Sequence, residues 1–518
     1  MKKISSILAL GAFACASVFA TGKDAWHEIE NPGEIVPTAG EFAVLISAET
    51  RADVAWRAVA EKLSSKFSGE IVVWEKDVSA VLPELQKRKP RYVAVVARAE
   101  EIDRVFVAKI HRISREIEPD FYGDAIFGIV SGARAKDAAA FASTPAKPLV
   151  LTRGFGTTNF DQQRFRKSFF ITDWRAREFV ETKDFVSGEK TSVPEGVEVV
   201  EVFANKWSEI KPEYVLTASH ATEFNLEMPF GEGLIASAGD KFYCFSKPQF
   251  EIFKRSLGNA AALREIAKKN RLKTIRRNSG PTIWIAAGNC LFGDALRTKN
   301  SMAITAISAA GVNQLVGYTV PSWFGEGGWG TNAVFFDNHP DTTVAQAWFF
   351  NNQEILSKLP EKLRSAEIEL APDGFEGPKL NTLARTIAEN GIEPTREIVG
   401  RFYDRDVVAF YGNPFFRASF DLSAPSVPPW NYRLFENGNA RKIAVSPSGN
   451  KLRKGDFRFW FPRVCEPGRG VSAKIFRSAG AEENVSEAKI AFTKNFVFVR
   501  DLELSPGDVL EIFYTAAQ

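Results

Sequence analysis

The sequence predicts an α/β protein with two strand–helix blocks, whose sheets are mostly parallel, followed by an all-β sandwich. The chain has 518 residues, which is enough for about three domains. Up to about residue 400, nearly continuous apolar runs alternate with helical patterns, and beyond it apolar and polar residues alternate. The composition is 45% hydrophobic and 25% charged, which is typical of a globular protein.

The first block, residues 38–147, contains four short apolar runs rich in β-branched residues. Strands buried on both faces have this composition. Between the runs, Val59, Leu63 and Phe67 recur at helical spacing and predict a helix that stops at Gly69. We therefore expect a parallel sheet with helices on both faces. The predicted strands are 42–46, 71–74, 92–96 and 126–130.

The second block, residues 148–399, repeats this alternation, with a predicted helix over 301–310. Residues 250–280 carry nine Lys and Arg against two Glu. We interpret this basic run as a solvated helix face rather than a nucleic-acid site. The predicted strands are 149–151, 197–202, 214–216, 283–285 and 314–317.

The third block, residues 400–518, changes to a period of two. Phe457, Phe459 and Phe461 alternate with polar residues, and Pro- and Gly-containing turn clusters separate such runs. This pattern predicts an antiparallel β-sandwich.

The N-terminus has the features of a signal peptide over residues 1–20. Lys2 and Lys3 precede an apolar run that ends in small residues. A membrane anchor fits less well because the run is short, and a lipoprotein site at Cys15 would have the bulky Phe13 before it. We expect an exported protein, periplasmic, on the cell surface or secreted, with no integral membrane span.

Charge and motifs exclude several functions. The formal net charge of +3 gives no reason to expect a nucleic-acid partner. The sequence has no zinc-site spacing, no Walker loop and no Gly-x-Gly-x-x-Gly that opens a helix directly after a predicted strand. We expect no catalytic metal and no cofactor, and the sequence leaves a structural calcium ion open.

One histidine and one cysteine stand at the ends of predicted buried strands. His220 follows strand 214–216, and Cys290 follows strand 283–285. Reactive groups gather at strand ends in open α/β sheets. A thiol and an imidazole together supply a nucleophile and a proton shuttle for acyl transfer.

These features resemble the caspase-fold (clan CD) cysteine peptidases, and among them the secreted bacterial gingipain-type enzymes. The resemblance rests on Ser219-His220, on Cys290 followed by a small-residue helix and the passage 309–317, and on the passages 122–135 and 407–414. The family usually has Gly where this chain has Ala221. Two α/β subdomains followed by an Ig-like domain also match the family's order.

The resemblance implies a peptidase that forms a thioester between Cys290 and its peptide or protein substrate. His220 would be the general acid and base, and the backbone amides of Cys290 and Ala221 would bind the oxyanion. Asp124 and Glu223 are the candidates for orienting His220. Trp323 and Glu326 are the candidates for a specificity pocket, with Glu326 pairing a basic side chain.

Two alternatives remain open at this stage. An inactive homologue would serve as an exported binding or surface protein. The same pair of residues would also perform acyl transfer other than proteolysis.

Overall fold

The computed structural model describes residues 26–29, 36–143, 148–338, 342–421, 423–465 and 471–517. The predicted signal peptide over residues 1–20 lies outside these ranges. Among the described residues, none of the helices has both the length and the apolar character needed to cross a membrane.

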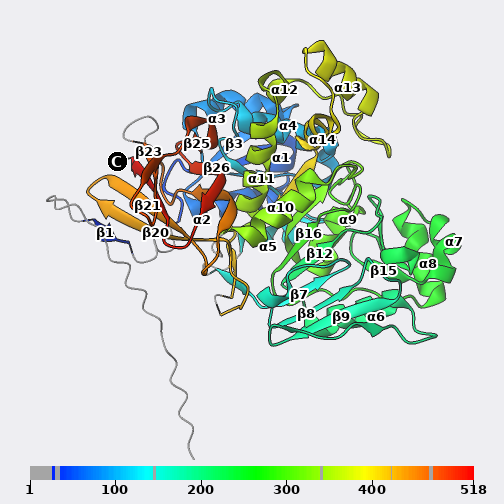
Figure 1. Ribbon diagram of the computed structural model, residues 1–518. Helices are drawn as coiled ribbons and strands as arrows, with labels where there is room; N and C mark the ends of the chain where they lie inside the picture. Colours follow the sequence, from blue (N-terminus) through cyan, green and yellow to red (C-terminus); the bar gives the residue numbers. More distant parts are fainter. Residues whose placement is uncertain are drawn as a thin grey trace, which may run out of the picture.

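One long sheet passes through both α/β blocks (Figure 1), with the strand order β10-β9-β8-β7-β12-β16-β17-β18-β5-β4-β2-β3. Several of its strands are buried at every residue, so both faces of the sheet are covered. The strands that matter below are β2 (Phe42–Ser47), β3 (Glu70–Trp74), β4 (Tyr92–Val96), β5 (Ile126–Val130), β7 (Arg153–Gly156), β8 (Lys167–Ile171), β9 (Glu178–Lys183), β10 (Val186–Ser187), β12 (Tyr214–Thr217), β16 (Thr282–Ala286), β17 (Val312–Tyr318) and β18 (Val408–Gly412).

The sheet consists of two parallel halves that run in opposite directions. The strands from β8 to β17 are parallel to one another, and so are those from β18 to β3. β17 and β18 pair antiparallel where the halves meet. The C-terminal edge of the first half therefore lies along the N-terminal edge of the second.

β18 falls inside the region predicted as the sandwich, residues 400–518. It belongs instead to the central sheet, where all five of its residues are buried. The first strand of the sandwich itself that follows is β20 (Trp430–Asn437). The sequence pattern placed the boundary between the α/β region and the sandwich too early, because a fully buried strand has the same continuous apolar sequence in either domain.

All four strands predicted for the first block are confirmed, and so is the helix that contains Val59, as α2 (Val54–Phe67). In the second block, the prediction of a strand at 197–202 is wrong, because those residues begin α6 (Val199–Ile210). Val199, Phe203 and Trp207 form its buried face at helical spacing. The predicted strand at 149–151 exists as β6 (Leu149–Leu151), but it pairs with β19 (Ala418–Phe420) outside the central sheet.

The helices lie between these strands and after them. The α-helices of the described residues are α1 (Ala48–Ala52), α3 (Leu82–Arg88), α4 (Arg104–Arg115), α5 (Ala135–Ala142), α7 (Phe250–Lys254), α8 (Ala260–Asn270), α9 (Met302–Thr305), α10 (Glu326–Asp337), α11 (Val344–Lys358), α12 (Glu361–Ser365), α13 (Leu380–Glu389) and α14 (Arg396–Asp404), besides α2 and α6. The basic run 250–280 contains α7 and α8, at the right of Figure 1.

The C-terminal region is a sandwich of two antiparallel sheets around its own core. One sheet has the order β1-β20-β21-β27-β23-β24 and the other β22-β26-β25. Both contribute to one apolar cluster, which includes Ile443, Phe459, Val497 and Ile512. The strands are β1 (His27–Glu28), β21 (Ala440–Pro447), β22 (Arg453–Trp460), β23 (Ser472–Phe476), β24 (Glu482–Asn484), β25 (Ile490–Phe492), β26 (Phe496–Leu504) and β27 (Val509–Thr515).

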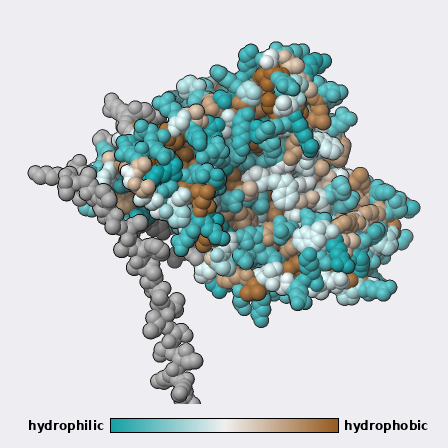
Figure 2. Space-filling model, in the orientation of Figure 1, coloured by the Kyte–Doolittle hydropathy of each residue, from teal (hydrophilic) through white to brown (hydrophobic). Residues whose placement is uncertain are grey.

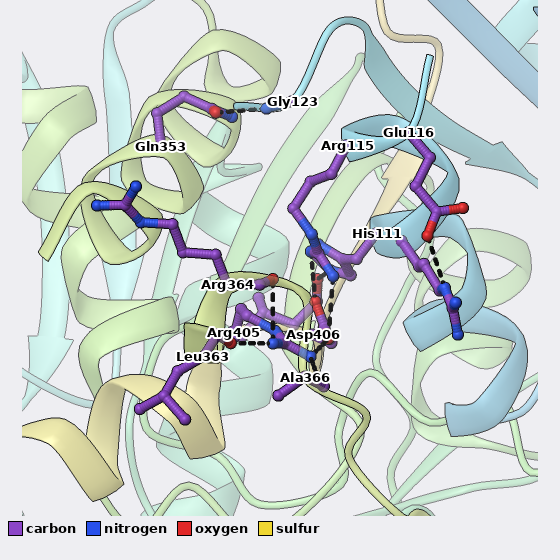
Figure 3. Close-up of polar contacts among 12 residues, drawn as sticks. His111, Arg115, Glu116, Gly123, Gln353, Leu363, Arg364, Ala366, Arg405 and Asp406 are labelled. Carbon is purple, nitrogen blue, oxygen red and sulfur yellow. Dashed lines mark hydrogen bonds and ion pairs between the residues drawn. The ribbon is translucent and has the colours of Figure 1, made fainter. Parts of the chain in front are cut away.

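A buried ionic cluster joins α4 to the segment before β18 (Figure 3). Arg115 and Arg405 both donate to the carboxylate of Asp406. Arg405 also donates to the backbone carbonyls of Leu363 in α12 and of Ala366 just after it. The two guanidinium groups hold the pKa of Asp406 below its usual range against the effect of burial. The cluster fixes α4, α12 and the start of β18 to one another.

Candidate active site

His220 and Cys290 lie on neighbouring loops, which follow the C-terminal ends of two adjacent inner strands of the sheet. They follow β12 and β16, which pair in parallel from Tyr214 beside Ile283 to Thr217 beside Ala286. Adjacent strands are ~4.8 Å apart, so the two loops begin side by side. The sequence predicted this placement of the two residues at strand ends.

Asn289 holds the two loops together. It is completely buried, accepts a hydrogen bond from the Thr217 hydroxyl at 2.5 Å, and donates to the carbonyl of Ser219 at 2.5 Å. The loops also touch at Gly288, where an added Cβ would lie 3.1 Å from the Cβ of Ala218. The residues just before His220 and Cys290 are therefore in direct contact.

On its other side, the Cys290 loop contacts the loop after β17. The backbone N–H of Ser322 donates to the sulfur of Cys290 at 3.4 Å, and the Ser322 hydroxyl lies 3.5 Å from the same sulfur. That hydroxyl also donates to the carbonyl of Gly288 at 2.8 Å. A donor directed at the sulfur stabilises negative charge on it.

The backbone after Cys290 turns sharply. Leu291 has a φ of 59°, in the left-handed region that non-glycine residues rarely adopt. Gly293 then lies so close to β17 that an added Cβ would be 2.2 Å from the carbonyl oxygen of Gly317. This turn leaves Cys290 partly exposed at the strand end while Leu291 and Phe292 are buried.

Glu227 lies directly opposite His220 in a hairpin. Ala221 and Leu226 form an antiparallel bridge, and the N–H of Glu227 donates to the carbonyl of His220 at 2.8 Å. Side chains that face each other across such a pair are on the same side, with their Cβ atoms about 5 Å apart. Partial burial raises the pKa of Glu227, and a positive charge on His220 lowers it in part.

Two backbone amides near the cysteine have no acceptor. Within the described ranges, neither Ala221 nor Cys290 donates a hydrogen bond from its N–H. The backbone hydrogen bonds of the hairpin are made by His220 and Thr222, which flank Ala221. The N–H of Ala221 therefore points away from the partner strand. Unpaired amides of this kind serve as donors for an oxyanion.

Asp124 is not a partner of His220. It precedes β5, and the order β12-β16-β17-β18-β5 separates the two residues by four strand spacings, or about 19 Å. Its carboxylate accepts a hydrogen bond from the N–H of Glu118 at 2.8 Å. Burial and the nearby negative charge of Asp120 raise the pKa of Asp124 to about 8.

Glu223 is in the turn of the His220 hairpin but makes no hydrogen bond or ion pair with His220 in the part of the chain described. Its carbonyl accepts from the N–H of Met302 at 2.7 Å. Its charge contributes to raising the pKa of Asp294 to about 6, an effect that is due first to burial. Glu227, the residue opposite His220 in this hairpin, is the acidic residue that we consider in place of Asp124 and Glu223.

Trp323 lines a groove of about 480 Å³, together with Pro321 and residues 375–382. Glu326 is not part of this lining. It begins α10, and Arg401 pairs with it, with 3.4 Å between Nε and Oε2. Trp323 therefore lines the groove, whereas Glu326 lies outside its lining and shares Arg401 with Glu397.

The remaining described cysteines have different surroundings. Cys244 and Cys465 are buried and unpaired, and burial raises the pKa of each thiol to about 12. Only Cys290 among the three is partly exposed. The described residues contain no group of three or more His, Cys, Asp or Glu arranged to hold a metal ion.

Sequence reasoning missed Asn289, Ser322 and Glu227. A signal existed for Asn289, which is a polar residue directly between a buried strand and the candidate nucleophile. Ser322 has a similar signal, since it follows the next strand of the same sheet. Glu227 could be found only by recognising the hairpin that starts at His220.

No protein-family model and no curated protein matches the sequence. Among solved structures, the chain resembles the Arg-specific cysteine proteinase gingipain R, with 9% identity and a TM-score of 0.40 over 92% of this chain and 98% of that one. It also resembles the complex of the pro- and mature domains of RgpB from Porphyromonas gingivalis, with the same identity and TM-score over 91% and 98%. A likeness with this identity and this TM-score does not indicate a function.

Proposed function

We propose that this protein is an exported cysteine peptidase in which Cys290 is the nucleophile and His220 the general acid and base. The observation that carries the proposal is the buried Asn289, which holds the loops of the two residues together at neighbouring strand ends. The unpaired amides of Cys290 and Ala221 support it as the oxyanion donors. The export signal over residues 1–20 and the Ig-like nature of the sandwich belong to the same proposal.

In the proposed reaction, His220 takes the proton of the Cys290 thiol, and the sulfur attacks the carbonyl carbon of a peptide bond. The negative charge that develops on the carbonyl oxygen is bound by the two amides. The imidazolium then gives its proton to the leaving amine as the C–N bond breaks, which leaves a thioester. His220 next activates a water molecule, which hydrolyses the thioester and frees the sulfur. Glu227, opposite His220 in the hairpin, stabilises the charged form of the imidazole through its own negative charge.

The test begins with the reactivity of the thiols. We expect iodoacetamide to alkylate Cys290 much faster than Cys244 and Cys465, because those two thiols are buried and their pKa values are about 12. Mass spectrometry of tryptic peptides measures the rate at each site. The variant Cys290→Ala should lose the fast phase, and His220→Ala should slow it.

Cleavage of a diverse peptide library by the purified protein is the second measurement. We expect both Cys290→Ala and His220→Ala to lower the rate by about 10²-fold or more. Uniform alkylation of the three thiols together with no cleavage would instead support an inactive binding protein. Transfer of the acyl group to an added amine, without net hydrolysis, would identify an acyltransferase.

A further inference from the structure

The groove beside Cys290 has an apolar lining that faces solvent. Trp323, Phe375 and Leu380 are 60%, 55% and 44% exposed, although all three are large hydrophobic residues. They line one groove with Pro321 and Pro378. A cluster of exposed apolar side chains in a concave site indicates ligand binding. Brown surface is also visible where Figure 1 draws α12 and α13 at the top of the molecule (Figure 2).

A short series of contacts connects this groove to the cysteine. Pro321 lines the groove, and the next residue, Ser322, contacts the sulfur of Cys290. The carbonyl of Pro321 accepts a hydrogen bond from the Tyr403 hydroxyl at 2.8 Å. Residues 375–382 form the wall of the groove that lies across from Trp323, which we call the far wall. Gly377 in this wall lies against the Tyr403 hydroxyl, which would be 2.2 Å from an added Cβ. A glycine is needed there for the wall to approach so closely.

Arg104 anchors the far wall to the loop of the nucleophile. Its guanidinium is buried and donates to the carbonyls of Gly374 and Glu376 at 2.8 and 2.9 Å. It also donates twice to the carboxylate of Asp294, at 3.0 and 2.9 Å. Asp294 is in the loop that follows Cys290, so one side chain sets the position of the wall relative to the nucleophile.

The charges in the groove favour neither a basic nor an acidic ligand. Glu376 and Lys379 both line it, and their formal charges cancel. Glu326, the predicted partner of a basic side chain, pairs with Arg401. The lining therefore has no excess charge of either sign, whereas Trp323, Phe375 and Leu380 contribute exposed apolar surface.

We propose that residues 375–382, together with Trp323, form a subsite that takes an apolar side chain of the peptide next to the scissile bond. The inference rests on the proposed function, because the position of the subsite is defined relative to Cys290. It also names the substrate class, which is a peptide with a residue such as Leu or Phe at that position.

Acetylated tripeptide chloromethyl ketones with Leu, Phe, Lys or Glu next to the reactive group test the proposal. In this reaction the sulfur of Cys290 bonds to the methylene carbon and chloride leaves. Each rate is divided by the rate with iodoacetamide, which has no side chain and reports only the reactivity of the thiol. We expect the Leu and Phe reagents to react at least about 10-fold faster than the Lys and Glu reagents.

Substitutions in the lining test whether the groove causes the preference for the Leu and Phe reagents. Phe375→Ala and Leu380→Ala should each lower the normalised rate of the Leu and Phe reagents by about 10-fold, while the iodoacetamide rate stays the same. Leu257→Ala is the matched control, because Leu257 is 52% exposed and lies outside the groove. It should change neither rate. Equal rates for all four reagents, faster reaction of the Lys reagent, or variants without effect would overturn the proposal.

A binding measurement separates this inference from the proposed function. Saturation-transfer NMR on the Cys290→Ala variant uses N-acetyl-phenylalaninamide and N-acetyl-lysinamide as probes. We expect a signal for the phenylalanine probe that Leu380→Ala weakens, and little signal for the lysine probe. If iodoacetamide fails to label Cys290 in the native protein but this pattern is found, the peptidase proposal fails and the apolar site remains. If neither probe binds, the subsite is refuted.

Discussion

The side chain of Asn289 donates a hydrogen bond to the carbonyl of Ser219 at 2.5 Å and thereby joins the loop of the candidate nucleophile to that of the candidate base. The same side chain accepts from Thr217, whose hydroxyl also accepts from the indole N–H of Trp284. A buried network in which each member is paired holds its loops in one arrangement. The geometry of the site therefore depends on a residue that takes no part in the chemistry.

The variant Asn289→Ala should lower kcat/KM for peptide cleavage by about 10²-fold, because the two loops lose their connection. It should also reduce the free energy of unfolding by about 1–3 kcal/mol, since Thr217 and Ser219 lose buried partners. Asn278→Ala is the control, because the Asn278 amide donates to Pro212 and Thr282 at the opposite end of the same two strands. It should cost comparable stability and leave kcat/KM near the native value. Equal losses of activity in the two variants would contradict a specific role for Asn289.

The variant Glu227→Gln should lower kcat by about 10-fold or more and change KM little. Glutamine keeps the size of the side chain but removes the charge that stabilises the imidazolium during the reaction. Steady-state kinetics measures the two constants separately. Glu223→Gln is the matched control in the same hairpin, and it should retain native kcat. A loss in the control alone would restore Glu223 as the orienting residue.

His111 should make a destabilising contribution as the solution becomes mildly acidic. This residue is buried on α4, its ring nitrogen lies 2.9 Å from the carbonyl of Val408, and burial lowers its pKa to about 4. Between pH 6.5 and 4 the unfolded chain binds a proton there that the folded chain does not. The free energy of unfolding therefore decreases as the pH falls through this window, by about 3 kcal/mol from this group.

Urea unfolding at pH 4.5, 5.5 and 7 measures that dependence. The variant His111→Gln should show a smaller decrease than the native protein, because glutamine does not titrate. His27→Gln changes an exposed histidine and should leave the dependence unaltered. Identical pH profiles for His111→Gln and the native protein would show that His111 does not cause the effect.

Removal of Arg104 should destabilise the protein by about 3–5 kcal/mol, because Asp294 would remain as a buried and unpaired carboxylate. Arg104 lowers the pKa of Asp294 in part, so Arg104→Met should raise it above about 6. A carboxyl group whose pKa is raised on folding costs stability as the pH rises through that pKa, so the loss should be larger at pH 8 than at pH 5. Urea unfolding of Arg104→Met, Asp294→Asn and the double variant measures the coupling. Additive effects would show that the pair does not act as a unit.

The sequence was most informative where local pattern and tertiary environment agree. The strands that include Val44, Val95 and Ile129 are buried on both faces, and their continuous apolar runs predict this directly. The pattern failed for residues 197–202, where β-branched residues suggested a strand but the buried positions continue at helical spacing to Ile210. It also failed for β18, since nothing local distinguishes a strand of the central sheet from one of the sandwich.

The sequence by itself determined the α/β class, the positions of most central strands, and the placement of His220 and Cys290 at strand ends. These follow from periodicity and from residue types at boundaries, which are local properties. Only the tertiary structure decided that Asp124 is distant from His220, that Glu227 lies opposite it in the hairpin, and that Arg401 pairs with Glu326. Strand order and cross-strand pairing bring together residues far apart in the chain, and the free energy that selects one pairing over another comes from packing of the whole sheet.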